Sequence, residues 1–261
     1  MLFRSDLNCG ASTSVSVRTV QRTIIDMSFR SRRSTRVPLL TVRQKALRLT
    51  WARQHLHWTV DDWKHIAWSD ECRFQSHRAD GRVRVWRQPH ESMDPSCQQG
   101  TVQAGGGSVM VWGVCSWRDM GPLLRLQMTL TAERYVSILA DHLQPFMSIV
   151  HSDRLGQFQQ NNATPHTSRV ATEWLQEHSS DFRHFHWPPK SPDMNIIEHV
   201  WDALQRAVQM RSPPPRTPVE LWTALQDSWC AMPPGYVQTL VESMPRRVAA
   251  LLRARGGPTR Y

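Results

Sequence analysis

The stretch from Trp187 to Trp201 reads Trp-Pro-Pro-Lys-Ser-Pro-Asp-Met-Asn-Ile-Ile-Glu-His-Val-Trp and predicts the start of an amphipathic helix. Ser191 or Asp193 can cap that helix, with Pro192 in an early position where a missing N–H costs nothing. The apolar residues that follow repeat at helical spacing and form one stripe: Ile197, Trp201, Leu204 and Val208. Glu198 lies beside this stripe, where a carboxylate is either a solvated boundary residue or a ligand at the edge of a site.

The order of the other apolar and polar segments predicts an α/β fold. We expect strands at residues 65–74, 83–86, 108–116, 158–163 and 182–187, and further helices at 131–150, 166–178, 219–231 and 236–254. The segment 108–116 is continuously apolar, which is typical of an interior strand buried on both faces. Strands come first and then alternate with helices, so we expect a mixed sheet with helices on both faces.

Positive charge is concentrated at one end of this chain of 261 residues, which is long enough to bury a sizeable core. The formal net charge is +10, and the first 60 residues hold eleven Arg and Lys against two acids. The other 201 residues hold 21 basic and 20 acidic side chains. This asymmetry indicates a polyanion-binding arm on a near-neutral body, with nucleic acid as the favoured partner and an anionic membrane surface as the alternative.

The cysteines argue against a disulfide framework or a structural zinc site. There are five of them, an odd number, and no pair has the C-x-x-C spacing. That usage favours a reducing compartment. No apolar run approaches 18 residues, and the first 15 lack the apolar core of a secretory signal. We therefore expect no membrane partner, and nuclear or cytoplasmic residence.

Residues 16–27 predict a short helix with Ser16 as its N-cap. Its apolar positions form a face that we expect to be buried: Val17, Val20, Ile24 and Met27. Arg18, Gln21 and Arg22 point the other way, either as an ordinary solvated face or as a recognition surface for phosphates and base edges. A basic run follows, which is either solvated and flexible or suited to a phosphate backbone or a narrow minor groove: Arg30, Arg32, Arg33 and Arg36.

The phrase Ser-Pro-Asp-Met-Asn-Ile-Ile-Glu-His-Val-Trp resembles the segment that carries the last catalytic carboxylate in cut-and-paste DNA transposases of the Tc/mariner superfamily. The resemblance implies that Glu198 is that acid and that residues 63–212 form a ribonuclease-H-like catalytic domain. It also implies a partial helix-turn-helix DNA-binding segment with a basic linker in 1–40, a connecting helix in 41–62 and a C-terminal helical extension in 213–261. By the same comparison, we expect the chain to be truncated at its N-terminus. Where the family tends to have glycine after the recognition helix, this chain has Ser28. A left-handed conformation there costs serine more free energy than it costs glycine.

Two-metal phosphodiester chemistry needs carboxylates that converge on ions about 4 Å apart. Asp70 closes the first predicted strand, Glu198 lies on the last helix of the set, and a third acid is expected after the strand at 158–163. There the chain reads Gln159-Gln-Asn161-Asn-Ala163, then Thr-Pro-His, where the family pattern is Gln-Asp-Asn-Ala followed by Pro-His. The predicted catalytic and metal-binding set is therefore Asp70, Asn161 and Glu198. Because an amide brings no negative charge, we expect weakened Mg²⁺ or Mn²⁺ binding and impaired catalysis.

Three residues near this set are secondary candidates. His166 either orients a carboxylate, contacts DNA, or is a packed or capping histidine. Asp193 is expected to cap its own helix rather than contact metal. Glu71 adjoins Asp70, but strand alternation predicts that it points to the opposite face and is a poor substitute ligand.

The resemblance predicts a transposon-derived DNA transposase, acting on double-stranded DNA at transposon terminal repeats and residing in the nucleus. The alternative is a DNA-binding and dimerising remnant without enzymatic activity. The long polar segment at 87–107 is, by the same resemblance, a candidate for contact with the partner protomer in a homodimer.

Overall fold

The structure, a computed structural model, describes residues 16–33, 40–75, 84–87, 107–126, 129–259 and 261. The chain divides into two units, a smaller one of residues 1–39 and 79–103 and a larger one of residues 40–78 and 104–261. None of the helices in the described ranges is long and apolar enough to cross a bilayer.

A five-stranded mixed sheet organises the larger unit, as the sequence predicted. Its strands, in spatial order, are β5 (Met120–Leu126), β4 (Ser108–Cys115), β2 (Ile66–Gln75), β6 (Gln157–Gln159) and β7 (Arg183–Phe185). β5, β4 and β2 are antiparallel neighbours, whereas β6 and β7 run parallel to β2. β5 was not predicted, and the strand predicted near 83–86 does not join this sheet.

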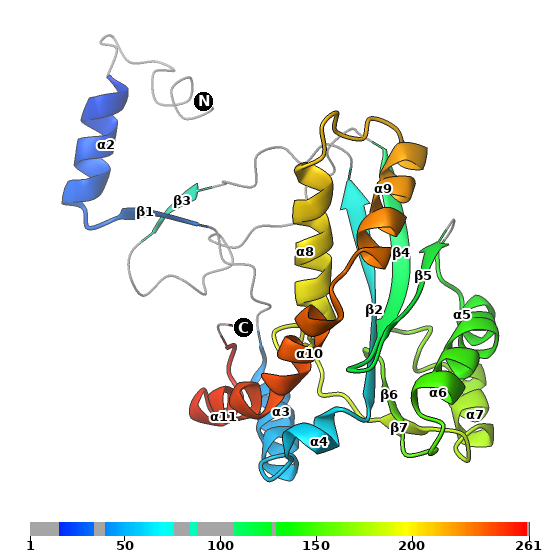
Figure 1. The fold of residues 1–261 in the computed structure, drawn as a ribbon. Coiled ribbons are helices and arrows are strands. Elements are labelled where there is room, and N and C mark those ends of the chain that lie inside the picture. The colour runs from blue at the N-terminus through cyan, green and yellow to red at the C-terminus, as the bar shows by residue number, and fades with distance from the viewer. Residues whose placement is uncertain (1–15, 34–39, 76–83, 88–106, 127–128, 260) are drawn as a thin grey trace. The chain divides into compact units, whose positions relative to one another are not determined.

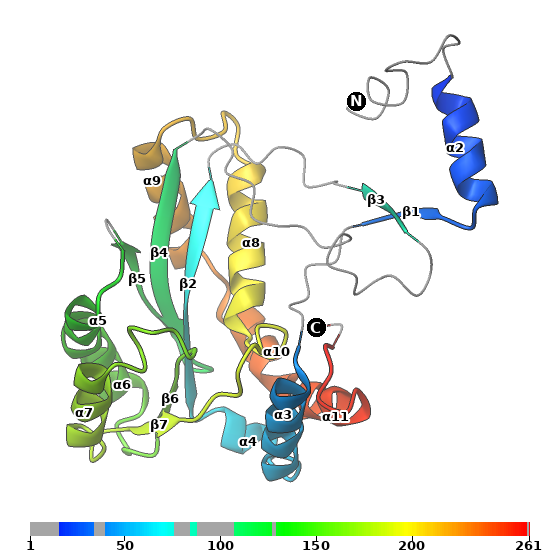
Figure 2. The same ribbon diagram turned by 180° about the vertical axis from the view of Figure 1, so that it is seen from behind.

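Helices cover both faces of the sheet (Figure 1). One face carries α8 (Ile197–Gln209) and α9 (Pro218–Cys230). The other carries α5 (Ala132–Ile138), the π-helical turn η3 (Leu139–Leu143), α6 (Gln144–Val150) and α7 (Arg169–Glu177), as the reverse view in Figure 2 also shows. The buried residues accordingly form two clusters, one on each side of the sheet.

Tryptophans bring α8 and α9 close to β4. A β-carbon added at Gly113 of β4 would lie 2.7 Å from the Trp201 ring and 2.9 Å from the Trp229 ring. A larger residue than glycine would push both helices away from the sheet, because ring atoms packed in a core cannot give way by that much. The position of α8, and with it Glu198, thus depends on a glycine far away in the sequence.

The apolar stripe predicted for α8 is confirmed, since Ile197, Trp201, Leu204 and Val208 are all buried. The predicted cap is wrong. α8 begins after Ile196, which makes no side-chain cap bond, and neither Ser191 nor Asp193 caps it. A turn intervenes, in which the N–H of Met194 donates to the carbonyl of Ser191 and that of Asn195 to Pro192.

The other helices described in the larger unit are α3 (Val42–Gln54), α4 (Val60–Trp63), α10 (Pro234–Glu242) and α11 (Met244–Arg253). α3 begins with a capping box between Thr41 and Gln44. One of its arginines, Arg48, has no solvent exposure.

The smaller unit contains α2 (Val17–Asp26), and its predicted N-cap is confirmed: Ser16 accepts a hydrogen bond from the N–H of Thr19. Val20 and Ile24 are half-buried, but Met27 is 58% exposed, contrary to the predicted buried face. Ser28 adopts the left-handed conformation, with φ of 66°. The basic run continues as β1 (Arg30–Arg33), which pairs antiparallel with β3 (Arg84–Arg87) in a two-stranded ribbon.

Candidate active site

Asp70 lies in the middle of β2, not at its end as predicted. The reason is the partner on each side of the strand. β4 pairs with β2 as far as Gln75, whereas the parallel strand β6 pairs only as far as Trp68, opposite Gln159. Beyond that point no described strand pairs with β2 on the β6 side, and the chain that leaves β6 passes beside Asp70.

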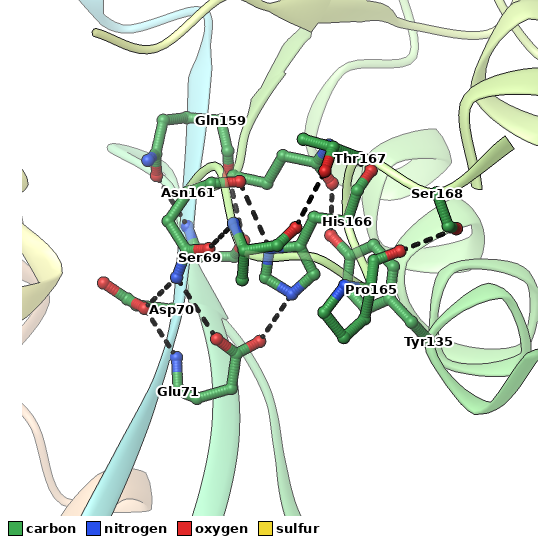
Figure 3. A network of polar contacts seen from close by, with 12 residues as sticks. Ser69, Asp70, Glu71, Tyr135, Gln159, Asn161, Pro165, His166, Thr167 and Ser168 are labelled. Carbon is green, nitrogen blue, oxygen red and sulfur yellow. Dashed lines mark hydrogen bonds and ion pairs between the residues drawn. The ribbon is translucent and has the colours of Figure 1, made fainter. Parts of the chain in front are cut away.

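The carboxylate of Asp70 is held by amide donors. The Nδ2 of Asn161 donates to Oδ1 at 2.8 Å, and the Nδ2 of Asn195 donates to Oδ2 at 3.1 Å. The backbone N–H of Glu71 also donates to Oδ1, at 2.8 Å (Figure 3). Burial is the main reason that the pKa of Asp70 rises to about 6, and the nearby charge of Glu71 raises it further.

Asn161 turns its N–H groups toward the acids. Besides Asp70, its Nδ2 donates to Oε2 of Glu71 at 3.3 Å. Its side-chain carbonyl oxygen faces the other way and accepts the N–H of Ala163 at 2.9 Å. The amide therefore bridges two carboxylates with its nitrogen, and its one group able to ligate a cation is engaged by the backbone.

Glu198 lies in the first turn of α8 and is half-buried. Burial raises its pKa to about 7, and the charges of Asp70 and then Asp202 raise it further. The structure thus brings Asp70, Asn161 and Glu198 into one region, where two carboxylates act on each other.

Glu71 reaches the same region, and the prediction that it points away is wrong. Its two carboxylate oxygens contact Asn161 and the Nε2 of His166, the latter at 3.1 Å. Strand alternation describes the direction of the Cβ atom, but β6 ends opposite Trp68, so at Glu71 no described strand pairs with β2 on that side. The long glutamate side chain can therefore extend on that side to the segment that follows β6.

His166 is buried and orients a carboxylate, the first of the roles considered for it. Its Nδ1 lies 3.2 Å from the backbone oxygen of Asn161, so the ring ties Glu71 to the segment after β6. The ring stacks on Tyr135 with 4.1 Å between ring centroids. The Tyr135 hydroxyl donates to the side-chain oxygen of Gln160, whose amide nitrogen donates to the backbone oxygen of His166.

The donor atoms of this region do not make a complete two-ion site. Among the residues that the structure describes, no three His, Cys, Asp or Glu side chains are placed to hold one metal ion. Asp70 and Glu198 offer carboxylate oxygens, but position 161 presents N–H groups, which repel a cation. The side chains present therefore do not fit two divalent ions.

The predicted DNA-binding residues all belong to the smaller unit. Arg18, Gln21 and Arg22 are exposed on α2. Arg30, Arg32 and Arg33 lie in β1, and Arg36 lies outside the described residues. The segment 88–106, which holds most of the predicted dimer contact, also lies outside them.

Asn195 was not predicted as a site residue, although it lies inside the motif that identified Glu198. It is buried and donates to Asp70, while its Oδ1 accepts the N–H of Ile197 at 3.3 Å, where α8 begins. The available signal was a polar residue in an otherwise apolar run, three positions before the acid.

Comparisons with known proteins agree with this architecture. The family described as "DDE superfamily endonuclease" matches residues 65–217, and the family described as "Transposase", a helix-turn-helix family, matches residues 5–57. Solved structures of Mos1 transposase share the fold. The paired-end complex with the left transposon end has a TM-score of 0.69 at 17% identity, over 94% of this chain and 72% of that one. The catalytic domain with Raltegravir and Mg has a TM-score of 0.64 at 14% identity, over 84% of this chain and 98% of that one.

Sequence relatives are closer. The Tcb2 transposase of Caenorhabditis briggsae is 37% identical over 246 residues, which cover 94% of this chain and 88% of the relative. The Tc1 transposase of Caenorhabditis elegans is 34% identical over 250 residues, with the same two shares. A matching endonuclease family over more than half of the chain, together with relatives of this similarity, decides the classification: the chain belongs to the Tc1/mariner-type DNA transposases.

Proposed function

We propose that this transposase binds transposon-end DNA in the nucleus but cleaves it poorly, because Asn161 replaces an acid of the metal-binding set. One observation carries the proposal. The Asn161 amide donates to Asp70 at 2.8 Å and to Glu71 at 3.3 Å, while its oxygen accepts the N–H of Ala163. An N–H group therefore occupies the place from which a carboxylate would offer oxygen to a cation.

Charge explains why this exchange matters. Hard divalent cations are selected largely by the number of carboxylates around them, and they dehydrate only where that charge is high. Mos1 has been solved in complexes with Mn and with Mg. For the present chain we expect Mg²⁺ and Mn²⁺ to bind weakly through Asp70 and Glu198. DNA cleavage and strand transfer should fall accordingly.

The DNA-binding part of the proposal rests on the smaller unit. The match to the helix-turn-helix transposase family covers 5–57, and Mos1 complexes contain paired transposon ends. Arg18 and Arg22 are exposed on α2 and are free of the ion pairs found among the described residues. Terminal-repeat duplex is therefore the proposed partner, and a homodimer through 87–107 the proposed assembly. Replacing both arginines by alanine should flatten the salt dependence of DNA binding by about two phosphate contacts.

The deciding experiment compares the chain as it stands with Asn161→Asp and Asn162→Asp. All three are tested for nicking of a labelled transposon-end duplex with Mg²⁺ and with Mn²⁺. Asn161→Asp should nick faster by about 100-fold or more, since metal stabilisation of the transition state amounts to several kcal/mol. Its melting temperature should also rise when Mn²⁺ is added, because an ion that binds only the folded state stabilises it.

Asn162→Asp is the matched control. It adds the same charge one position along, at an exposed residue whose amide donates to the backbone oxygen of Trp187. It should remain as slow as the unchanged chain and show no Mn²⁺-dependent gain. Equal and rapid nicking by the unchanged chain and Asn161→Asp would overturn the proposal.

A further inference from the structure

Arg48 is a fully buried arginine on α3, far in sequence from the acids. Its guanidinium reaches two other segments of the chain. Nε donates to the backbone oxygen of Gly256 at 2.9 Å, and Nη2 donates to that of Gly257 at 3.1 Å. Nη1 lies 3.0 Å from the backbone oxygen of Lys190 and 2.8 Å from Oγ of Ser191. Every nitrogen of the guanidinium is therefore hydrogen-bonded.

Asp193 completes the arrangement. Nη1 and Nη2 of Arg48 donate to Oδ1 at 2.8 Å and to Oδ2 at 2.7 Å, which is a bidentate pair. Oδ2 also accepts the N–H and the hydroxyl of Thr259, each at 2.9 Å. We call Arg48, Asp193, Thr259 and the backbone oxygens of Lys190, Gly256 and Gly257 the tail clamp. It joins α3, the turn before α8 and the C-terminal segment.

The tail clamp ends two residues from the acid site. Asp193 is followed by Met194, which has no solvent exposure, and then by Asn195, which donates to Asp70. Asn195 also holds the N–H of Ile197, the first residue of α8, and Glu198 comes next. A second buried arginine, Arg247, donates to the backbone oxygen of Asp193 at 3.3 Å. A shift of Asp193 must therefore move both Asn195 and the first turn of α8.

We propose that Arg48 and Asp193 are positioning residues for the acid site: the tail clamp sets where Asn195 and Glu198 stand relative to Asp70. For cleavage, this inference rests on the proposed function, since it assumes that Asn161→Asp restores the reaction. A planar guanidinium fixes direction as well as distance, because its two parallel bonds to a carboxylate allow one relative orientation. An apolar pair would fill the same space without fixing the turn that carries Asn195.

The test uses Arg48→Lys and Thr259→Val, each made in the Asn161→Asp chain, with Arg53→Lys as the matched control. Arg53 is an exposed arginine on the same helix. Lysine keeps the charge at position 48 but loses the bidentate geometry. Arg48→Lys should lower kcat for nicking by about 10- to 100-fold, the size expected for small misplacement of a reacting group. KM for the duplex should stay within about twofold, because the DNA-binding residues are untouched. Thr259→Val should change kcat in the same direction by less.

Hydrogen exchange supplies a readout that does not depend on cleavage. In Arg48→Lys, amides of residues 194–200 should exchange faster, while those of α7 keep the rate that they have in Arg53→Lys. Unchanged exchange at 194–200 would overturn the inference, as would an equal rise in every peptide, which would mean that the clamp serves global stability alone. If Asn161→Asp itself fails to cleave, the proposed function fails, and the exchange pattern still decides the role of the tail clamp.

Discussion

Two aspartates in this transposase, Asp70 and Asp193, are both largely buried, but the groups around their carboxylates differ in charge. The carboxylate of Asp193 meets the full charge of Arg48 through two short bonds and two further donors from Thr259. Among the described residues, Asp70 accepts hydrogen bonds from two neutral amides and a backbone N–H, and it faces Glu71 and Glu198. Burial with a counter-charge marks an acid that holds structure together. Burial beside other acids instead raises the pKa of the carboxylates, as it does for Asp70 and Glu198.

The largest effect on stability is expected where a buried carboxylate pairs with a buried arginine. Asp193→Asn leaves the buried guanidinium of Arg48 without a counter-charge, which should lower the free energy of unfolding by about 3–5 kcal/mol. Urea denaturation at pH 7 measures this loss. Asp61→Asn is the control: Asp61 is 82% exposed, Lys64 is its ion-pair partner among the described residues, and solvent screens the pair, so the loss should be far smaller than that of Asp193→Asn. Equal losses of stability in Asp193→Asn and Asp61→Asn would contradict the view that the buried pair with Arg48 stabilises the fold.

At the acid site, removal of a carboxylate is expected to raise stability, whereas Asp193→Asn lowers it. The pKa of Glu198 is raised from 4.5 to about 7 in the folded chain, so between these values the folded state holds a proton that the unfolded state has released. The free energy of unfolding must therefore fall as pH rises through this window. Glu198→Gln removes that loss and should stabilise the chain at pH 8 by on the order of 1–3 kcal/mol.

Denaturation of Glu198→Gln at pH 8 and at pH 4 measures this effect, and the gain should vanish at the lower pH. Glu242→Gln, at an exposed position at the end of α10, should show no such dependence. A stability gain that persists unchanged at pH 4 would mean that repulsion among the carboxylates is not its source.

The smallest effect on stability is expected for a solvent-exposed ion pair. Arg211 and Asp227 lie 3.0 Å apart, with side chains 36% and 58% exposed. Arg211→Ala should lower the free energy of unfolding by only about 0.2–1 kcal/mol, because solvent screens the pair. Thermal melting beside Asp193→Asn would show whether burial, and not the ion pair itself, makes the tail clamp strong. A loss as large as that of Asp193→Asn would contradict this view.

The sequence predicted correctly those features that depend on residues close together in the chain. The stripe on α8, the cap at Ser16 and the mixed sheet each follow from residues close together in sequence, and each was confirmed. The juxtaposition of Asp70 and Asn161 followed from motif resemblance, since the 91 positions between them carry no local signal.

The errors share one cause, a partner distant in sequence. Asp193 has a suitable residue type for a cap, but Arg48, 145 positions away, takes its carboxylate instead. Strand alternation fixes the Cβ direction of Glu71, but β6 ends too early to pair with β2 at that point, so the long side chain reaches Asn161. β5 was missed because Met-Gly-Pro-Leu-Leu-Arg-Leu holds glycine and proline, which argue against a strand until β4 supplies its partner.

The amide at position 161 has a chemical consequence for any preparation of this protein. Asparagine side chains hydrolyse slowly in solution, releasing ammonia and leaving aspartate or isoaspartate. In the fraction of molecules where aspartate forms, a carboxylate stands at the position where we propose that an acid has been lost, without any change in the gene. Trace cleavage by an aged sample should therefore be compared with the mass of the peptide that contains Asn161, because a contaminating minority of repaired molecules would imitate weak activity of the whole.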